Sequence, residues 1–186
     1  MKKRLMVDLD DVICNKGYLY IINKFLNTNY QVDDFTDYYM QDVIPENRKE
    51  EWNDFFAQHN GYDKAEFICT AQESLKKLSE KYEIFIVTAY YIKDRHITSG
   101  KVLKDKLEWL LTYLPFIPLS NYVFANNKEI IDCDIKIDDK LSNLIGHGET
   151  KLLFTAYHNK GLTNEELKSE NVQRVDNWQQ IEDILL

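Results

Sequence analysis

The first residues that could do chemistry are three acids near the amino terminus. The run LMVDLDDV at residues 5–12 leads from apolar side chains directly into Asp8, Asp10 and Asp11. Carboxylates this close together raise each other's pKa unless a cation or hydrogen bonds compensate. Side chains two residues apart on an extended segment point to the same side, so we expect Asp8 and Asp10 to flank one reacting atom. Either a metal ion lies among these acids or they cap a helix.

Other polar side chains follow similar apolar runs. Thr88 comes near the end of EIFIVTA, Lys128 just after NYVFA, and the pair Asp138 and Asp139 ends CDIKIDD; a further run is KLLFTA. Short β-branched or aromatic runs separated by helical stretches are typical of buried parallel strands. Ligands bind at the carboxyl ends of such strands. We therefore expect these side chains to meet at one edge of a sheet.

The types of these residues indicate which ligand they bind. Clusters of carboxylates select hard cations, and a site with few protein ligands and room for water suits Mg²⁺ better than Ca²⁺ or Zn²⁺. A lysine and a threonine beside the metal are suited to hold phosphate oxygens during phosphoryl transfer. The pattern predicts a magnesium site that acts on a small phosphorylated substrate.

The ordered set of motifs resembles the signatures of the haloacid dehalogenase (HAD) superfamily of phosphohydrolases. MVDLDDV is similar to the first signature, hhhDxDx[TV] with h apolar, and IFIVTA to the second; Lys128, ten residues before Asp138, matches the third, and DIKIDD matches the fourth. More narrowly, the chain resembles the 5′(3′)-deoxyribonucleotidases (5′ nucleotidase, deoxy, cytosolic type C), whose bacterial members have a helix similar to KDKLEWL at residues 104–110. Asp11 replaces a glycine of many relatives, and Ala89 a serine of the animal enzymes.

The resemblance implies a role for each catalytic residue. Asp8 is the expected nucleophile, which forms an aspartyl-phosphate intermediate. Asp10 is expected to protonate the leaving oxygen and then to accept a proton from the attacking water. Thr88 and Lys128 are expected to bind phosphoryl oxygens, and the backbone N–H of Ala89 can take the place of the missing serine.

The resemblance also implies a set of metal ligands. Mg²⁺ is expected to contact the Asp8 carboxylate, the Asp10 backbone carbonyl and Asp139, with Asp138 beside it. Its charge allows the acids to crowd together.

The fold that this requires is α/β: a three-layer, Rossmann-like HAD core with a central parallel sheet and a small helical cap inserted after the first strand. Helical spacing of apolar residues predicts helices over 72–82 and 101–114, and an N-capped terminal helix from Asp176 onward. Their predicted buried residues are Leu75, Leu78, Tyr82, Val102, Leu103, Leu107, Leu110, Leu111, Leu114, Trp178, Ile181 and Leu185.

The predicted cap comprises residues 16–70, and residues 1–15 and 71–186 form the core domain. The cap segment holds half of the aromatic residues of the chain and a predicted helix with Pro45 in its first turn. It is much longer than a simple crossover requires. Most of its rings are expected to form the cap's own core, but Phe35, Tyr38 and Tyr39 are candidates to stack on a nucleobase.

Composition excludes several classes of protein. A net charge of −8 argues against a nucleic acid polymer as partner. No apolar stretch is long enough to be a signal sequence or to cross a membrane, which predicts a cytoplasmic protein. The three cysteines suggest neither a disulfide framework nor a zinc site, and we expect them to be buried. The histidines His59, His147 and His158 are expected at the surface. Nothing in the sequence indicates an oligomeric state.

The favoured interpretation is a Mg²⁺-dependent phosphomonoesterase, most plausibly a 5′(3′)-deoxyribonucleotidase. A HAD phosphatase for sugar phosphates or other small phosphoesters remains an alternative, as does a catalytically silent phospho-ligand-binding protein on the same fold. A phospho-accepting receiver module is disfavoured, because its acid pair follows the first strand and its accepting aspartate the third.

Overall fold

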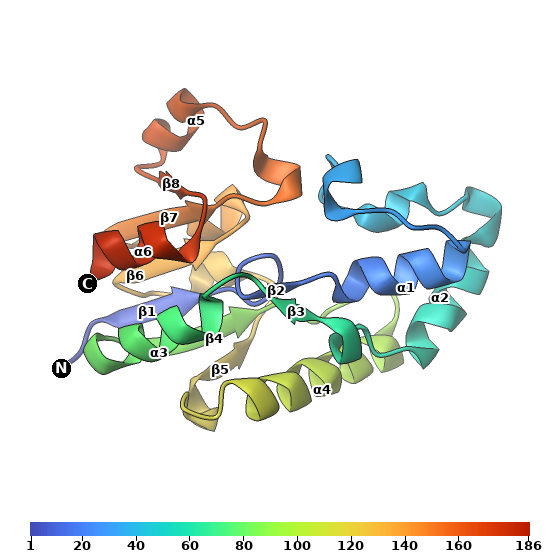
Figure 1. Ribbon diagram of the computed structural model, residues 1–186, viewed down its shortest axis with the longest axis horizontal. Coiled ribbons are helices and arrows are strands. Elements are labelled where there is room, and N and C mark those ends of the chain that lie inside the picture. Colours follow the sequence, from blue (N-terminus) through green and yellow to red (C-terminus); the bar gives the residue numbers. More distant parts are fainter.

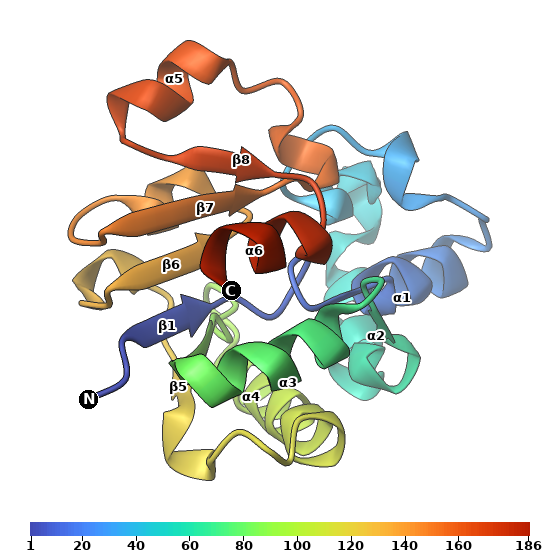
Figure 2. The same ribbon diagram turned by 60° about the vertical axis from the view of Figure 1, so that its left-hand side comes forward.

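Six short strands form one parallel sheet in the computed structural model, which describes residues 1–186 (Figures 1 and 2). The strands are β1 (Arg4–Val7), β4 (Glu83–Thr88), β5 (Tyr122–Phe124), β6 (Ile135–Asp138), β7 (Thr150–Phe154) and β8 (Gln173–Val175). Their order across the sheet is β5-β4-β1-β6-β7-β8, with every pair parallel. The predicted α/β class and parallel sheet are confirmed. Strand β8 was not predicted, because QRV is too short and polar to form an apolar run.

Three helices cover one face of the sheet: α3 (Ala71–Lys81), α4 (His96–Tyr113) and α6 (Trp178–Leu185). Alternate strand residues such as Val7, Ile86 and Ile137 point into this layer and form a core of 25 buried residues with the helices. The other face is covered by the short helix α5 (Asn164–Ser169) and by single 3-10 turns between strands. Strand β1 therefore lies inside the sheet, with β4 and β6 on either side (Figure 1).

Helix α4 differs from its prediction in two respects. It begins five residues earlier than the predicted span, at His96, and its buried face runs through Ser99, Lys106 and Leu110. Leu111 is exposed, so the prediction for that residue is wrong. The arc of α4 that touches the sheet is narrower than the leucine stripe, and a charged residue occupies part of it.

The terminal helix has the predicted buried residues but another cap. Trp178, Ile181 and Leu185 are buried, as predicted. The N-cap is Asn177, whose side chain accepts the N–H of Gln180 at 3.0 Å.

The segment that follows β1 forms a second small layer beyond the strand ends (Figure 1). It contains α1 (Gly17–Leu26) and α2 (Lys49–Gln58), and Pro45 directly precedes the 3-10 turn that leads into α2. Its rings pack mainly edge to face in a separate cluster of nine buried residues. The antiparallel strands β2 (Cys14–Asn15) and β3 (Glu66–Phe67) join the two ends of the segment.

Two further expectations are decided by burial and helix length. Cys14 and Cys133 are buried, but Cys69 is exposed in the turn between β3 and α3, so the prediction that all cysteines are buried is wrong. None of the helices has the length and apolar character required to cross a membrane.

Candidate active site

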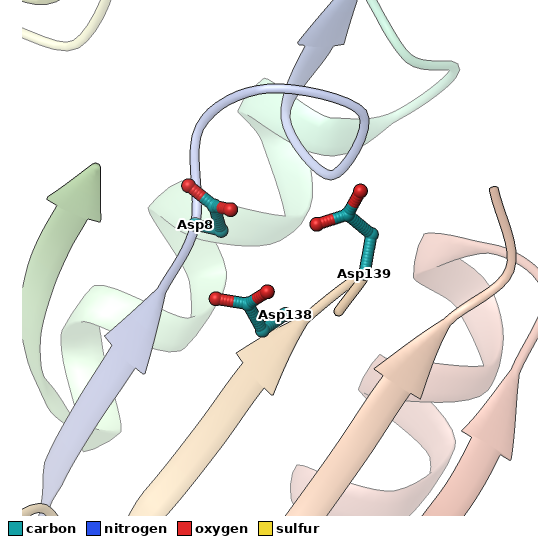
Figure 3. A group of neighbouring side chains, drawn as sticks. All are labelled: Asp8, Asp138 and Asp139. Atoms are coloured by element: carbon teal, nitrogen blue, oxygen red, sulfur yellow. The ribbon is translucent and has the colours of Figure 1, made fainter. Parts of the chain in front are cut away.

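Three buried carboxylates meet at the carboxyl edge of the sheet. Asp8 follows β1, Asp138 ends β6 and Asp139 comes next, and the three side chains point toward one another (Figure 3). One oxygen from each lies within 4.8 Å of the others. Burial raises the pKa of Asp8 to about 7, against the opposing effect of Lys128. Burial also raises the pKa values of Asp138 and Asp139. Such a cluster is stabilised when a cation is present.

The backbone fixes the position of the nucleophile candidate. The N–H of Asp8 donates to Ile137 O at 3.0 Å, and its carboxylate accepts the N–H of Leu9 at 2.6 Å. The chain then turns through Asp11, whose φ of 56° lies in the left-handed region that glycine favours and that aspartate tolerates. This turn folds the chain back on itself, so that the Asp11 N–H donates to the Cys14 carbonyl at 2.8 Å.

Lys128 neutralises two of the acids. It begins a 3-10 turn after β5, and its buried ammonium lies 2.5 Å from Asp8 and 2.8 Å from Asp138. Burial lowers the pKa of Lys128, but the two carboxylates outweigh this effect and raise it. An ammonium has three N–H groups, so one remains for another acceptor.

Asp10 has a lysine of its own. The ammonium of Lys106, on α4, lies 2.6 Å from Asp10 and donates to the Thr88 hydroxyl at 2.7 Å and to the Ala89 carbonyl. The hydroxyl of Tyr62 donates to the other Asp10 oxygen. Burial alone raises the pKa of Asp10, but Lys106 and Tyr62 outweigh it and the pKa is lowered. Lys106 and Tyr62 were missed as site residues: Lys106 lies within the KDKLEWL run, but the resemblance gave it no role, and Tyr62 gave no signal.

Asp139 has a histidine partner. His158 lies after β7 and its Nε2 is 2.6 Å from Asp139 Oδ2, with only 7% of the histidine side chain exposed. The prediction that His158 lies at the surface is therefore wrong, because the turn after β7 folds toward the acids. His59 is half-buried against Phe55, whereas His147 is exposed.

The three candidate aromatic residues separate into two groups. Tyr38 is partly exposed; its ring packs edge-on against His158 with centroids 4.9 Å apart, and the Lys140 ammonium lies 4.4 Å from its centroid. Tyr39 packs against Tyr38. Phe35 is buried in the second hydrophobic cluster. The structure therefore places Tyr38 beside the histidine that contacts Asp139, Tyr39 against Tyr38, and Phe35 in the packing of α1 and α2.

A parallel sheet that brings a DxD segment, a threonine, a lysine and a second acid pair to one edge defines a phosphohydrolase of the HAD type. Solved structures share this fold. A haloacid dehalogenase-like hydrolase, SP0104 from Streptococcus pneumoniae, superposes with a TM-score of 0.58 at 14% identity, covering 100% of this chain and 99% of that one. A HAD-hydrolase of Bacillus subtilis bound to magnesium gives a TM-score of 0.51 at 13% identity, covering 99% and 98%.

Sequence comparison identifies the family. The profile of the 5′ nucleotidase, deoxy (Pyrimidine), cytosolic type C protein family matches residues 2–186. The 5′(3′)-deoxyribonucleotidase of Bacillus subtilis (strain 168) is 36% identical over 176 residues, which cover 95% of this chain and 80% of that protein. The chain therefore belongs to the 5′ nucleotidase, deoxy, cytosolic type C family. It is a phosphoric monoester hydrolase, and the resemblance drawn from its motifs is confirmed.

Proposed function

We propose that the protein is a Mg²⁺-dependent 5′(3′)-deoxyribonucleotidase that hydrolyses deoxynucleoside monophosphates through an aspartyl-phosphate on Asp8. The observation that carries this proposal is the meeting of Asp8, Asp138 and Asp139 oxygens within 4.8 Å, beside the buried ammonium of Lys128. Family membership and the named activity of the Bacillus relative support the choice of substrate.

The donor set fits magnesium. All candidate ligands are oxygens, and three carboxylates close to one another match the preference of a hard cation. The Asp8 and Asp139 carboxylates and the backbone carbonyl of Asp10 would hold the ion, with Asp138 beside them. When bound, Mg²⁺ supplies charge that screens the repulsion between the Asp8 carboxylate and an anionic phosphate.

In the first half-reaction, an Asp8 oxygen attacks phosphorus while the bond from phosphorus to the ester oxygen breaks. Asp10 gives its proton to that leaving oxygen. Lys106 and Tyr62 lower the pKa of Asp10 when no substrate is bound; the anionic phosphoryl group that arrives beside Asp10 raises this pKa and favours the protonated form that the step requires. The free N–H of Lys128 can donate to a phosphoryl oxygen.

In the second half-reaction, water attacks phosphorus and the Asp8–phosphorus bond breaks. Asp10 accepts the proton of this water, which restores its carboxyl group for the next turnover. The Thr88 hydroxyl donates only a long bond of 3.4 Å to Ala89 O, and it can exchange this bond for one to a phosphoryl oxygen. The backbone N–H of Ala89 provides a further donor.

Residues 16–70 act as a cap over this edge of the sheet in our proposal. Two observations support this role: the segment has a separate hydrophobic cluster, and the antiparallel strands β2 and β3 join its two ends. Tyr38, which packs against His158, and Tyr39, which packs against Tyr38, are exposed and are suited to contact the nucleoside, each base stack contributing about 1–3 kcal/mol. Phe35 would support Tyr38 indirectly, because it packs against Tyr157, whose hydroxyl donates to the Tyr38 carbonyl at 2.9 Å.

The test is phosphate release from a panel of 5′- and 3′-deoxynucleoside monophosphates and sugar phosphates, with Mg²⁺ and with EDTA. We expect nucleotides to be preferred and EDTA to abolish turnover. Asp8→Asn should lower kcat by at least about 10⁴-fold, whereas the exposed Asp54→Asn should have no effect. A preference for sugar phosphates by orders of magnitude would refute the substrate assignment, and an active Asp8→Asn variant would refute the mechanism.

A further inference from the structure

Lys106 has no donor left for a substrate. Its ammonium carries three N–H groups, and three acceptors take them: the Asp10 carboxylate, the Thr88 hydroxyl and the Ala89 carbonyl. Only 6% of its side chain is exposed. Lys128 differs, because it has two acceptors and one free N–H. Lys106 is therefore placed to hold protein groups and not to bind a phosphate.

Tyr62 is held in place from several sides. Its backbone N–H donates to the Asn60 side chain at 2.9 Å, and its ring lies edge-on to Trp109. The neighbouring Gly61 packs so closely on α1 that a Cβ atom on Gly17 would lie 2.5 Å from the Gly61 carbonyl oxygen. The position of the Tyr62 hydroxyl is thus fixed by packing between the segment 16–70 and α4.

The two oxygens of Asp10 are each held by one donor. Lys106 contacts Oδ2 and Tyr62 contacts Oδ1, while 49% of the Asp10 side chain stays exposed. An isolated aspartate with this exposure has several rotamers available. With a donor fixed on each oxygen, the carboxyl group keeps one orientation, and each oxygen retains a lone pair that can take a proton.

We propose that Lys106 and Tyr62 are positioning residues that orient the Asp10 carboxyl group for proton transfer to the leaving oxygen of the substrate. This inference rests on the proposed function, in which Asp10 delivers a proton as the phosphorus–oxygen bond breaks and recovers one from the attacking water. Tyr62 comes from the inserted segment and Lys106 from the core, so both parts of the chain contribute to the orientation of one acid.

The ratio of the rates for two substrates with different leaving groups separates a loss of Asp10 orientation from a general structural defect. A nucleoside alkoxide is a poor leaving group and depends on the proton from Asp10. p-Nitrophenolate is a stable anion and leaves without one. Loss of Asp10 orientation should therefore slow the hydrolysis of the nucleotide much more than the hydrolysis of p-nitrophenyl phosphate. Partial unfolding, in contrast, lowers both rates equally.

The experiment measures kcat and KM for both substrates in Tyr62→Phe and Lys106→Met. Tyr62→Phe deletes one hydroxyl and keeps the ring. Tyr122→Phe is a matched control, because it also deletes a buried hydroxyl, which bonds to carbonyls of α4 and its C-cap away from Asp10. General acid–base catalysis contributes about 10²–10⁴-fold, so we expect kcat on the nucleotide to fall about tenfold in Tyr62→Phe and about 10²-fold in Lys106→Met. On p-nitrophenyl phosphate both should fall less than about threefold.

Equal loss on the two substrates in both variants would overturn the proposal, as would a loss that appears in KM alone or an equal shift in Tyr122→Phe. Failure of the proposed function has a different result: the wild-type protein would then release no phosphate from nucleotides, or Asp8→Asn would remain active. A normal wild type and an inactive Asp8→Asn, together with an unchanged substrate ratio in Tyr62→Phe, refute the positioning role alone.

Discussion

The candidate active site contains two buried lysines with different surroundings. Lys128 lies between two carboxylates that are almost fully buried, Asp8 and Asp138. Lys106 contacts one carboxylate that is half exposed, Asp10, and two neutral oxygens, those of Thr88 and Ala89. The same residue type therefore balances buried charge in one place and orients an accessible acid in the other.

The difference in burial indicates which lysine contributes more to stability. Removal of one partner from a buried ion pair is costly because the other charge is left in a region that water does not reach. Only 10% of the Asp8 side chain and none of the Asp138 side chain is exposed, whereas 49% of the Asp10 side chain is. Stability should accordingly depend more on Lys128 than on Lys106. A bound metal ion should offset the loss of positive charge only beside Lys128.

The largest effect is expected from Lys128→Met in metal-free buffer. Two buried carboxylates lose their counter-charge, and we expect the free energy of unfolding to fall by about 3–5 kcal/mol. Urea denaturation measures it, with the exposed Lys76→Met on α3 as a lysine control away from the buried cluster. A loss below about 1 kcal/mol would mean that Asp8 and Asp138 do not need this ammonium.

Magnesium should act on the acid cluster alone. At a concentration about 100 times its Kd, Mg²⁺ should stabilise the wild type by about 2.7 kcal/mol, measured as a shift in the urea midpoint. Asp139→Asn should lose this stabilisation, and the exposed Asp132→Asn should keep it. Lys106→Met should also keep the stabilisation by Mg²⁺. If this variant lost it, the contacts of Lys106 and those of Lys128 would be coupled.

Lys106→Met should have an intermediate effect on stability. The change removes the donor from the buried Thr88 hydroxyl oxygen and leaves the Ala89 carbonyl with only the long bond of 3.4 Å from Thr88, while water solvates Asp10. We expect a loss of about 1–3 kcal/mol, the usual cost of unsatisfied buried polar groups. If urea denaturation showed a larger loss of unfolding free energy in Lys106→Met than in Lys128→Met, the proposed difference between the two lysines would be wrong.

The smallest effect is expected at a lysine–acid pair outside the site. Lys77 and Ser74 on α3 hydrogen-bond Glu182 on α6 and lower its pKa from the ordinary value of 4.5. A lowered pKa in the folded state contributes stability above the unfolded value, and this contribution is lost as the pH falls through the folded value. We expect Glu182→Gln to destabilise the protein by less than about 1 kcal/mol at neutral pH and to match the wild type in strong acid. Urea titrations across this pH range test it, and a difference that grows on acidification would contradict the sign.

Much of the fold was predictable because local patterns carry it. The runs ending near Asp8, Thr88 and Asp138 became β1, β4 and β6, since continuous apolar segments of this length are stable when buried on both faces. Strand β8 escaped because it is held by its neighbour β7 and not by its own composition. The exposed Leu111 shows that a leucine stripe does not specify how wide the contact of a helix is.

The partners of the acids were less predictable. Tyr62 lies 52 residues from Asp10 in the chain, Lys106 lies 96 residues from it, and His158 lies 19 residues from Asp139. Residues this far apart do not share a helix or a strand, so the periodicity of one element cannot predict these contacts. The three contacts depend on how α4, the inserted segment and the turn after β7 pack around the strand ends.

The amino-acid sequence by itself determined the parallel strands and the acids, threonine and lysine that follow them, because the direction of a parallel strand brings whatever follows it to the same edge. Only the tertiary structure decided which side chains complete the site. A lysine buried on a helix and a tyrosine in an inserted turn reach Asp10 through packing between distant elements, and no periodicity along the chain encodes such a contact.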